Sequence, residues 1–203
     1  MTEVRPWQPR IVRAAYTDSS LGVYQAYPRE IAEPALRAGT FMTPFKRERM
    51  TWIKPSFLWM MYRSGWAEKP NQERILRIDI DRAGFEWALA HAALSHFQPG
   101  VHMDRERWRA DVTGSPVRVQ WDPDRSVRLE PEPWRAIQVG LSGEAVERYV
   151  DRWIVHITDV TDLAHSTHAA VREGRLDDAL RELPAERPYP LAEALRERVG
   201  ADS

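Results

Sequence analysis

The chain has 203 residues, of which 43% are hydrophobic and 29% charged, and its formal net charge is -1. This size and composition suit one folded domain with a sizeable core, and they exclude a chain that is disordered throughout. The near-zero net charge excludes a protein that is basic overall, as a nucleic-acid coat would be, but leaves room for a local basic patch.

The chain has no cysteine and few lysines. The absence of cysteine excludes disulfides, thiol nucleophiles and cysteine-ligated zinc. Only Lys46, Lys54 and Lys69 are lysines, so arginine supplies nearly all of the basic residues. Arginine favours planar, bidentate contacts with phosphate or carboxylate, although a genomic base composition that enriches arginine and alanine together is the simpler explanation.

The N-terminal segment predicts a flexible arm over residues 1–12 rather than a targeting signal. It is polar and contains proline, and it has no apolar signal core. No apolar run in the chain approaches the roughly 20 residues that span a bilayer. These features predict a cytoplasmic protein without a membrane partner, and they leave its oligomeric state open.

Next along the chain, a strand, a helix and a loop are expected. Gly22–Pro28 is rich in β-branched and aromatic residues and predicts a strand. Arg29–Gly39 predicts a helix that is short or bent, because Pro34 lies inside it and Gly39 is a natural C-terminal stop. Thr40–Met50 predicts a basic loop.

The stretch from Arg49 to Trp66, RMTWIKPSFLWMMYRSGW, combines aromatic residues with fixed positive charges. It predicts the end of a strand at Thr51–Ile53, a turn at Lys54–Ser56, and a short helix to Arg63 that Ser56 could cap. The helix is most simply core-facing. The basic and aromatic half before it is the better candidate for a ligand site.

The middle and C-terminal parts alternate strands with helices. Glu73–Asp81 predicts a strand and Arg82–Phe97 a helix, while Ser115–Pro123 and Pro133–Gly143 predict two more strands. Gly143–Thr161 is amphipathic, with its large apolar residues on one stripe. The last forty or so residues predict a helical cover with a proline-rich peg, followed by a tail over residues 191–203.

Together these elements predict one α+β domain over residues 13–190. About five strands, with helices between and after them, favour a mixed or antiparallel sheet with a C-terminal helical cover.

The common catalytic and metal-binding motifs do not occur in this chain. GxGxxG, GxxxxGK[ST], HExxH and GxSxG are all missing. His165 and His168 could share a helix face, but no strong ligand pattern surrounds them, so no metal site is predicted. Trp121–Arg125 (WDPDR) offers two carboxylates, yet a turn explains Asp-Pro-Asp without any chemistry.

Four long and unusual blocks carry a family resemblance: VYQAY, the stretch from Arg49 to Trp66, VRVQWDP and RAIQVGLSG. On these blocks the chain is identified as a member of a bacterial family known as domain of unknown function 4291. The resemblance covers about Arg13 to Pro190, and the family name implies no activity.

A second resemblance concerns VYQAYPREIAEPALRAGTF. This segment is similar to the opening of ADP-ribosyltransferase folds, in which a signature strand precedes a short helix, a glycine and an aromatic residue. Gln25 stands where such a strand usually has His or Arg, and Gln138 stands on the late strand that usually carries a glutamate. The resemblance implies NAD as a substrate and transfer to a macromolecule, with nucleic acid as the first candidate.

The resemblance and the residue chemistry together suggest a set of site residues. Catalytic roles, as groups that orient the nicotinamide ribose, fall to Gln25 and Gln138. Aromatic side chains that stack and basic side chains that bind phosphate suit a dinucleotide. Single-stranded nucleic acid is bound by the same kinds of side chain. The cofactor-binding candidates are Tyr24, Tyr27, Arg49, Trp52, Lys54, Ser56 and Arg135, and the nucleic-acid-binding candidates are Arg63 and Gln120.

Plainer explanations stay open for most of these residues. Gln25 could be a solvent-facing strand residue, Arg49 and Lys54 surface charges, Ser56 a helix cap, and Trp52 part of the core. At the level of the whole protein, the first alternative is a non-catalytic nucleotide-, RNA- or DNA-binding module. The second is a structural or interaction protein whose aromatic block is buried.

Overall fold

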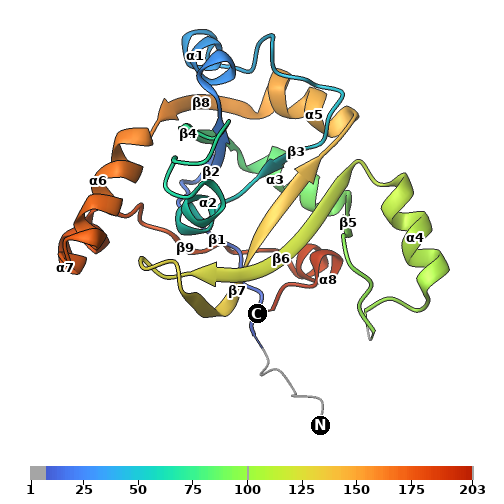
Figure 1. Ribbon diagram of the computed structural model, residues 1–203. Coiled ribbons are helices and arrows are strands. Elements are labelled where there is room, and N and C mark those ends of the chain that lie inside the picture. Colours follow the sequence, from blue (N-terminus) through green and yellow to red (C-terminus); the bar gives the residue numbers. More distant parts are fainter. Residues whose placement is uncertain (1–7, 100, 203) are drawn as a thin grey trace.

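Two β-sheets that touch at one point organise the molecule (Figure 1). A computed structural model describes residues 8–99 and 101–202. The first sheet is antiparallel and three-stranded, in the order β2 (Ser20–Tyr27), β4 (Arg74–Asp81), β8 (Ile154–Asp159). Its edge strand β2 meets the second sheet through a single bridge, in which the Tyr24 and Lys54 main chains exchange hydrogen bonds of 2.7 and 3.2 Å.

The second sheet is mixed. Its four strands lie in the order β3 (Thr51–Ile53), β7 (Pro131–Leu141), β6 (Val117–Arg125), β5 (Ala92–Leu94). β5 runs parallel to β6, while the other pairs are antiparallel. A separate two-stranded ribbon pairs β1 (Arg13–Ala14) with β9 (Arg187–Pro188).

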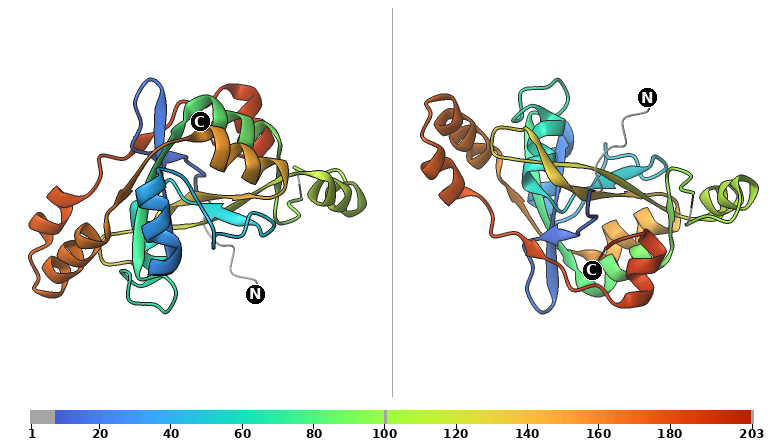
Figure 2. Two further views of the ribbon diagram at one scale, coloured as in Figure 1. Left: turned by 90° about the horizontal axis from the view of Figure 1, so that it is seen from above. Right: turned by 90° about the horizontal axis from the view of Figure 1, so that it is seen from below.

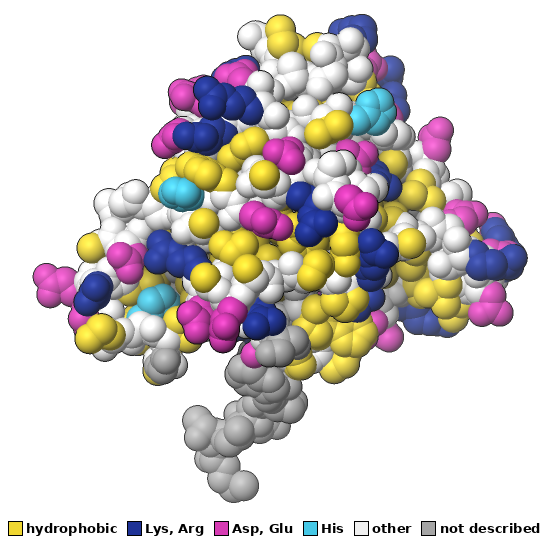
Figure 3. Space-filling model, turned by 180° about the vertical axis from the view of Figure 1, so that it is seen from behind, with side chains coloured by type: hydrophobic (Ala, Val, Ile, Leu, Met, Phe, Trp, Pro, Cys, Tyr) yellow, Lys and Arg dark blue, Asp and Glu magenta, His cyan; other side chains and the backbone are white. Residues whose placement is uncertain are grey.

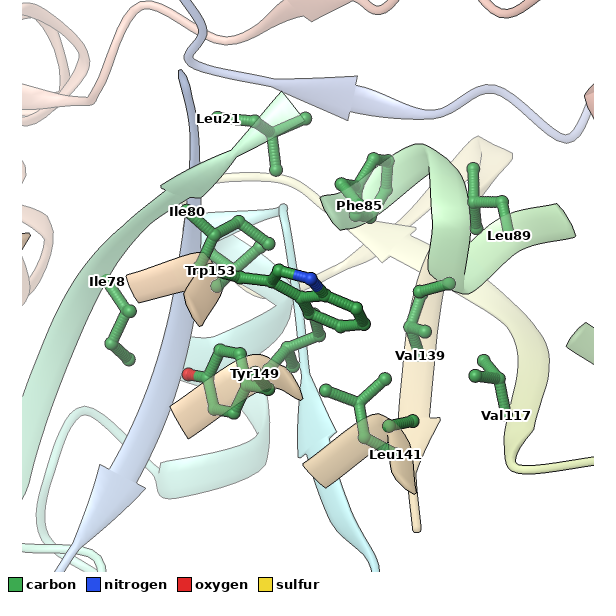
Figure 4. Packing of buried hydrophobic residues seen from close by; sticks show 14 of the residues in the cluster. Leu21, Ile78, Ile80, Phe85, Leu89, Val117, Val139, Leu141, Tyr149 and Trp153 are labelled. Carbon is green, nitrogen blue, oxygen red and sulfur yellow. The ribbon is translucent and has the colours of Figure 1, made fainter. Parts of the chain in front are cut away.

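The main core fills the space between the two sheets. Residues of β4 alternate with period two, so Ile78 and Ile80 face inward, and Val139 and Leu141 of β7 do the same from the other sheet. Figure 4 shows Trp153 lying among these side chains together with Phe85. A second cluster packs α2 (Phe57–Ser64) and α6 (Thr161–Arg172) on the other side of the three-stranded sheet.

Helices cover the sheets and extend to either side. α6 and α7 (Leu176–Glu182) project on one side, and α4 (Arg105–Gly114) projects on the other (Figure 2). The remaining helical segments are α1 (Arg29–Ala38), α3 (Arg82–Ala90), α5 (Glu144–Arg148), the π-helix η1 (Tyr149–Trp153) and α8 (Glu193–Val199). The predicted α+β class with mixed and antiparallel sheets in one domain is therefore confirmed.

The elements predicted from local sequence signals before residue 65 are confirmed. β2 and α1 form as expected, and α1 ends at Gly39, whose φ of 71° is the left-handed conformation that glycine adopts easily. Ser56 caps α2 by accepting a hydrogen bond from the Trp59 main-chain N–H at 3.2 Å.

Two expectations for the later elements were wrong. The helix expected over Arg82–Phe97 ends at Ala90, because Ala92–Leu94 pairs with β6 and is fully buried. Trp121–Arg125 is not a turn. It lies in β6, where a bulge between Pro123 and Arg125 accommodates the proline within the strand. The apolar stripe of the amphipathic segment Gly143–Thr161 is buried from Val146 to Trp153, and the segment then continues as the edge strand β8.

Both ends of the described chain differ from the expected arm and tail. Residues 1–7 of the expected arm lie outside the described residues. Within the rest of it, Val12 is buried, and the Arg10 main-chain N–H donates to Asp202 at 2.7 Å. The expected tail over 191–203 contains α8, whose Val199 joins the main core.

Two further features concern the helices of the described residues and the charge on one face of the molecule. No helix among the described residues is long and apolar enough to cross a bilayer. Seen from behind, basic and acidic side chains are interspersed (Figure 3).

Candidate functional site

A cavity of about 690 Å³ lies where the two sheets separate. Its walls are the end of β2, the loop that leads into β3, the end of α2, and one face of β3, β7 and β6. The predicted site residues that line it are Gln25, Tyr27, Arg49, Trp52, Lys54, Arg63, Gln120 and Gln138. The other predicted residues, Tyr24, Ser56 and Arg135, lie outside it.

Strand alternation explains how one sheet face supplies much of this cavity. Trp52 and Lys54 are two residues apart and so point to the same side, away from the buried Ile53 between them. Gln120 and Gln138 stand directly opposite each other on β6 and β7. The reverse face of the same strands is apolar and belongs to the core.

Lys54 is the most unusual group in the cavity. Its side chain is only 6% exposed, and its ammonium has one hydrogen bond, to the Trp52 carbonyl at 3.3 Å. No carboxylate pairs with it among the described residues. Burial and the charge of Arg63 lower the pKa of Lys54 from its ordinary value to about 8, and Asp122 opposes part of that effect. A buried, nearly unpartnered cation beside a cavity is suited to an anionic ligand.

Further cations surround Lys54 and leave the cavity positively charged. Lys46, Arg49 and Arg63 line it with exposed side chains. None of the three forms an ion pair within residues 8–99 and 101–202. The lining residues include no aspartate or glutamate. The geometry therefore offers several donors to phosphate or carboxylate oxygens.

Gln25 is the hub of a buried hydrogen-bond network in the cavity wall. Its amide nitrogen lies 2.6 Å from the Thr51 hydroxyl, 2.9 Å from the Tyr27 hydroxyl and 3.3 Å from the Trp52 carbonyl. Its carbonyl accepts a hydrogen bond of 2.7 Å from Tyr149. Every polar atom of the side chain is thus engaged, so Gln25 fixes the wall rather than presenting free donors.

The two phenols of this network stay protonated at neutral pH. Burial raises the pKa of Tyr27 to about 12, although hydrogen bonds from Thr51 and Gln25 oppose the change. Burial also raises the pKa of Tyr149 well above its ordinary value. Both hydroxyls act as neutral hydrogen-bonding groups here.

Asp122 lies two residues after Gln120 on β6, beside the two opposed glutamines, and was not among the predicted site residues. Its carboxylate accepts hydrogen bonds from Gln120 at 3.0 Å and from Gln138 at 2.6 Å. We expected a turn here because Asp-Pro-Asp is turn-like in sequence. The available signal was the even spacing of Gln120 and Asp122, which places both on one strand face.

The three residues outside the cavity have structural partners. Tyr24 is fully buried against Phe57 in the second cluster. The hydroxyl of Ser56 donates to Asp124 at 2.9 Å while it caps α2. The guanidinium of Arg135 donates to the Trp121 carbonyl at 2.9 Å, and its main chain bridges to Arg10. None of them is placed to contact a ligand in the cavity.

Gly140 sets the position of Trp52 in the cavity. A methyl group added at Gly140 would lie 2.9 Å from the indole of Trp52 and 2.9 Å from the sulfur of Met50. We expect Gly140→Ala to lower the free energy of unfolding by about 1–3 kcal/mol, because a rigid ring must move. It should also change the near-ultraviolet circular dichroism.

Gly114→Ala is the matched control for urea unfolding, since nothing lies within 4 Å of its added methyl group. It should leave both stability and spectrum nearly unchanged. A Gly140→Ala variant as stable as the parent, with the same spectrum, would show that the indole does not rest on Gly140.

The described residues offer no evident metal site. No group of three or more His, Asp or Glu side chains among them is arranged to hold a metal ion. His168 instead stacks on Trp66 with ring centroids 5.2 Å apart and lies 3.3 Å from Glu68.

Comparison with known proteins identifies the family of this chain. A family model described as Domain of unknown function (DUF4291) matches residues 11–189. A search of curated proteins finds no match. The matched region contains every residue that lines the cavity.

Proposed function

The chain belongs to the DUF4291 family, and from the cavity that its fold builds we propose that it is an ADP-ribosyltransferase-like protein that uses NAD to modify a macromolecule. The observation that carries this proposal is the gathering of Lys54, Arg49 and Arg63 with an indole and amide groups in one 690 Å³ cavity. Cavities of roughly 300–1,000 Å³ accommodate ligands of small-molecule to dinucleotide size.

The residues match the parts of a dinucleotide. The ammonium of Lys54 and the guanidinium group of Arg49 would hold the pyrophosphate. The indole of Trp52 would stack on one of the two rings. Gln138 and Gln120 would contact hydroxyl or amide groups, while Gln25 would keep this wall in place.

The order of elements at the cavity supports the finer proposal of an ADP-ribosyltransferase-like fold. β2, α1, Gly39 and Phe41 follow one another as the resemblance implies. Tyr27 at the end of β2 lines the cavity and packs on Phe41, with ring centroids 5.3 Å apart. The segment that carries the resemblance therefore forms part of the candidate site.

The proposed reaction asks little acid–base chemistry of the protein. The bond between C1′ of the ribose and the nicotinamide nitrogen breaks, its electron pair stays on that nitrogen, and nicotinamide leaves as a neutral molecule. A hydroxyl or amine of the target then forms a bond to C1′ and releases its proton to water. The protein's contribution is to position the dinucleotide and stabilise charge.

The target is proposed to be a nucleic acid that docks at the cavity mouth. Lys46 and Arg63 are exposed there and form no ion pair within the described ranges. Exposed cations of this kind bind backbone phosphates of any sequence.

A nicotinamide-release assay tests the proposal. The protein is incubated with NAD labelled in its adenylate half, separately with DNA, RNA and a protein mixture. We expect free nicotinamide and transfer of the label to one class of macromolecule. Arg63→Gln should lower the rate by about tenfold, because a charge-assisted contact to phosphate is lost.

Arg128→Gln is the charge-matched control, since Arg128 is exposed in the β6–β7 connection and does not line the cavity. It should react like the parent. If the protein neither binds NAD nor releases nicotinamide, the proposal fails.

A non-catalytic nucleotide- or nucleic-acid-binding module is the second candidate. It is favoured by two observations: no carboxylate lines the cavity, and the amide of Gln25 is fully occupied by protein groups. Binding of NAD or of single-stranded nucleic acid without nicotinamide release would support this candidate over the first.

A further inference from the structure

The carboxylate of Asp122 dictates which way two amide groups of the cavity point. An ionised carboxylate only accepts hydrogen bonds, so an amide that contacts it must present its NH2 group. Gln120 and Gln138 both do so, at 3.0 and 2.6 Å. Each amide oxygen is therefore turned away from Asp122. Neither oxygen has a hydrogen-bond partner within residues 8–99 and 101–202, and both side chains line the cavity.

We propose that Gln120 and Gln138, held by Asp122, form a subsite that selects an uncharged hydrogen-bond donor on the dinucleotide. Two amide oxygens directed at the ligand are satisfied by an NH2 group and left unpaired by a carbonyl. The donor is either the carboxamide of nicotinamide or the exocyclic amine of adenine. This inference rests on the proposed use of NAD, and Asp122 acts in it as a positioning residue.

Two analogues with the same charge as NAD test the subsite by calorimetric titration. The 3-acetylpyridine analogue replaces the carboxamide NH2 with a methyl group, and the hypoxanthine analogue replaces the adenine amine with a carbonyl. We expect one of the two to bind about tenfold weaker than NAD, because an amide oxygen is then left without a donor. The analogue that weakens identifies which ring occupies the subsite.

Asp122→Asn provides the matching variant. The NH2 group of the new side chain would face one of the two glutamines. That glutamine must turn its amide oxygen toward this NH2 group and so present its own NH2 group to the cavity. The penalty against the weaker analogue should then shrink from about tenfold to about twofold. Because the ligands carry equal charge, their affinity ratio is unaffected by the lost carboxylate charge. Asp111→Asn, an exposed change on α4, should keep the parent ratio.

The outcomes separate this inference from the proposed function. If NAD and both analogues bind within twofold of one another, the subsite does not exist, while the use of NAD stands. If none of the three binds, both proposals are wrong. The subsite is supported if one analogue binds the parent more weakly than NAD does and if Asp122→Asn reduces this difference in affinity. Asp111→Asn should leave the difference unchanged.

Discussion

Replacing Lys54 with methionine is expected to make the protein more stable and, at the same time, a poor binder of NAD. The ammonium is buried and lacks a paired carboxylate, so methionine removes a desolvated charge while it keeps most of the side-chain volume. The fall in the pKa of Lys54 from 10.5 to about 8 corresponds to about 3 kcal/mol. We expect Lys54→Met to raise the free energy of unfolding at pH 7 by about 1–3 kcal/mol.

The pH dependence of this gain has a definite sign. Below about pH 8 the amine is protonated in both the folded and the unfolded chain, so the full cost of the buried charge is present. Between about pH 8 and 10.5 the folded chain has lost the proton while the unfolded chain still holds it, and the cost shrinks with rising pH. Above pH 10.5, the pKa of this lysine in the unfolded chain, the parent and Lys54→Met should therefore differ little in stability.

NAD affinity should move in the opposite direction. Loss of the Lys54 charge removes a charge-assisted contact to the pyrophosphate, and we expect binding about 10- to 100-fold weaker. Lys69→Met is the matched control, because Lys69 is exposed and contacts only main-chain carbonyls at the end of α2. A Lys54→Met variant that is less stable and binds NAD normally would show that this lysine serves the fold and not a ligand.

Replacing Gln25 with leucine is expected to cause a large loss of stability. Leucine cannot accept the hydrogen bond from the Tyr149 hydroxyl or donate to Thr51, so buried polar groups lose their partners. We expect the free energy of unfolding to fall by about 2–4 kcal/mol, measured by urea denaturation.

A double substitution shows whether the network is the cause. Tyr149→Phe removes the stranded hydroxyl, so the two changes together should cost less than the sum of each alone. If Gln25→Leu is as stable as the parent but no longer binds NAD, Gln25 contacts the ligand directly and is not the hub of the wall.

Local chemistry made the first part of the fold predictable. Gly39 stops α1 because it adopts a positive φ, and Ser56 caps α2 through a side-chain oxygen. β5 could not be foreseen in this way. Its three residues continue an apolar helical pattern, and only pairing with β6, more than twenty residues later in the chain, makes them a strand.

The residues of the cavity could be predicted where they are neighbours in the sequence. They were harder to predict where it matters to which side of its strand a residue points. The Tyr24–Lys54 bridge brings Gln25 beside Lys54 and Trp52. Tyr24 itself points to the opposite side, as alternation requires of successive strand residues. Arg135 is separated from Gln138 by an odd number of positions and is likewise directed elsewhere.

Asp122 was missed for a different reason. A proline between two aspartates is normally a sign of a turn, and a bulge inside β6 is an uncommon alternative. Only the pairing of β6 with β7 sets Gln120 opposite Gln138 and so places both amides on this carboxylate.

The pH dependence of NAD affinity tests the central claim, that a dinucleotide binds in this cavity against a protonated Lys54. Titration calorimetry on the unmodified protein should show one NAD per chain at pH 7. Affinity should be about tenfold lower at pH 9, because the Lys54 charge is lost as the pH rises through its pKa of about 8. The absence of binding at pH 7, or equal affinity at both pH values, would contradict it.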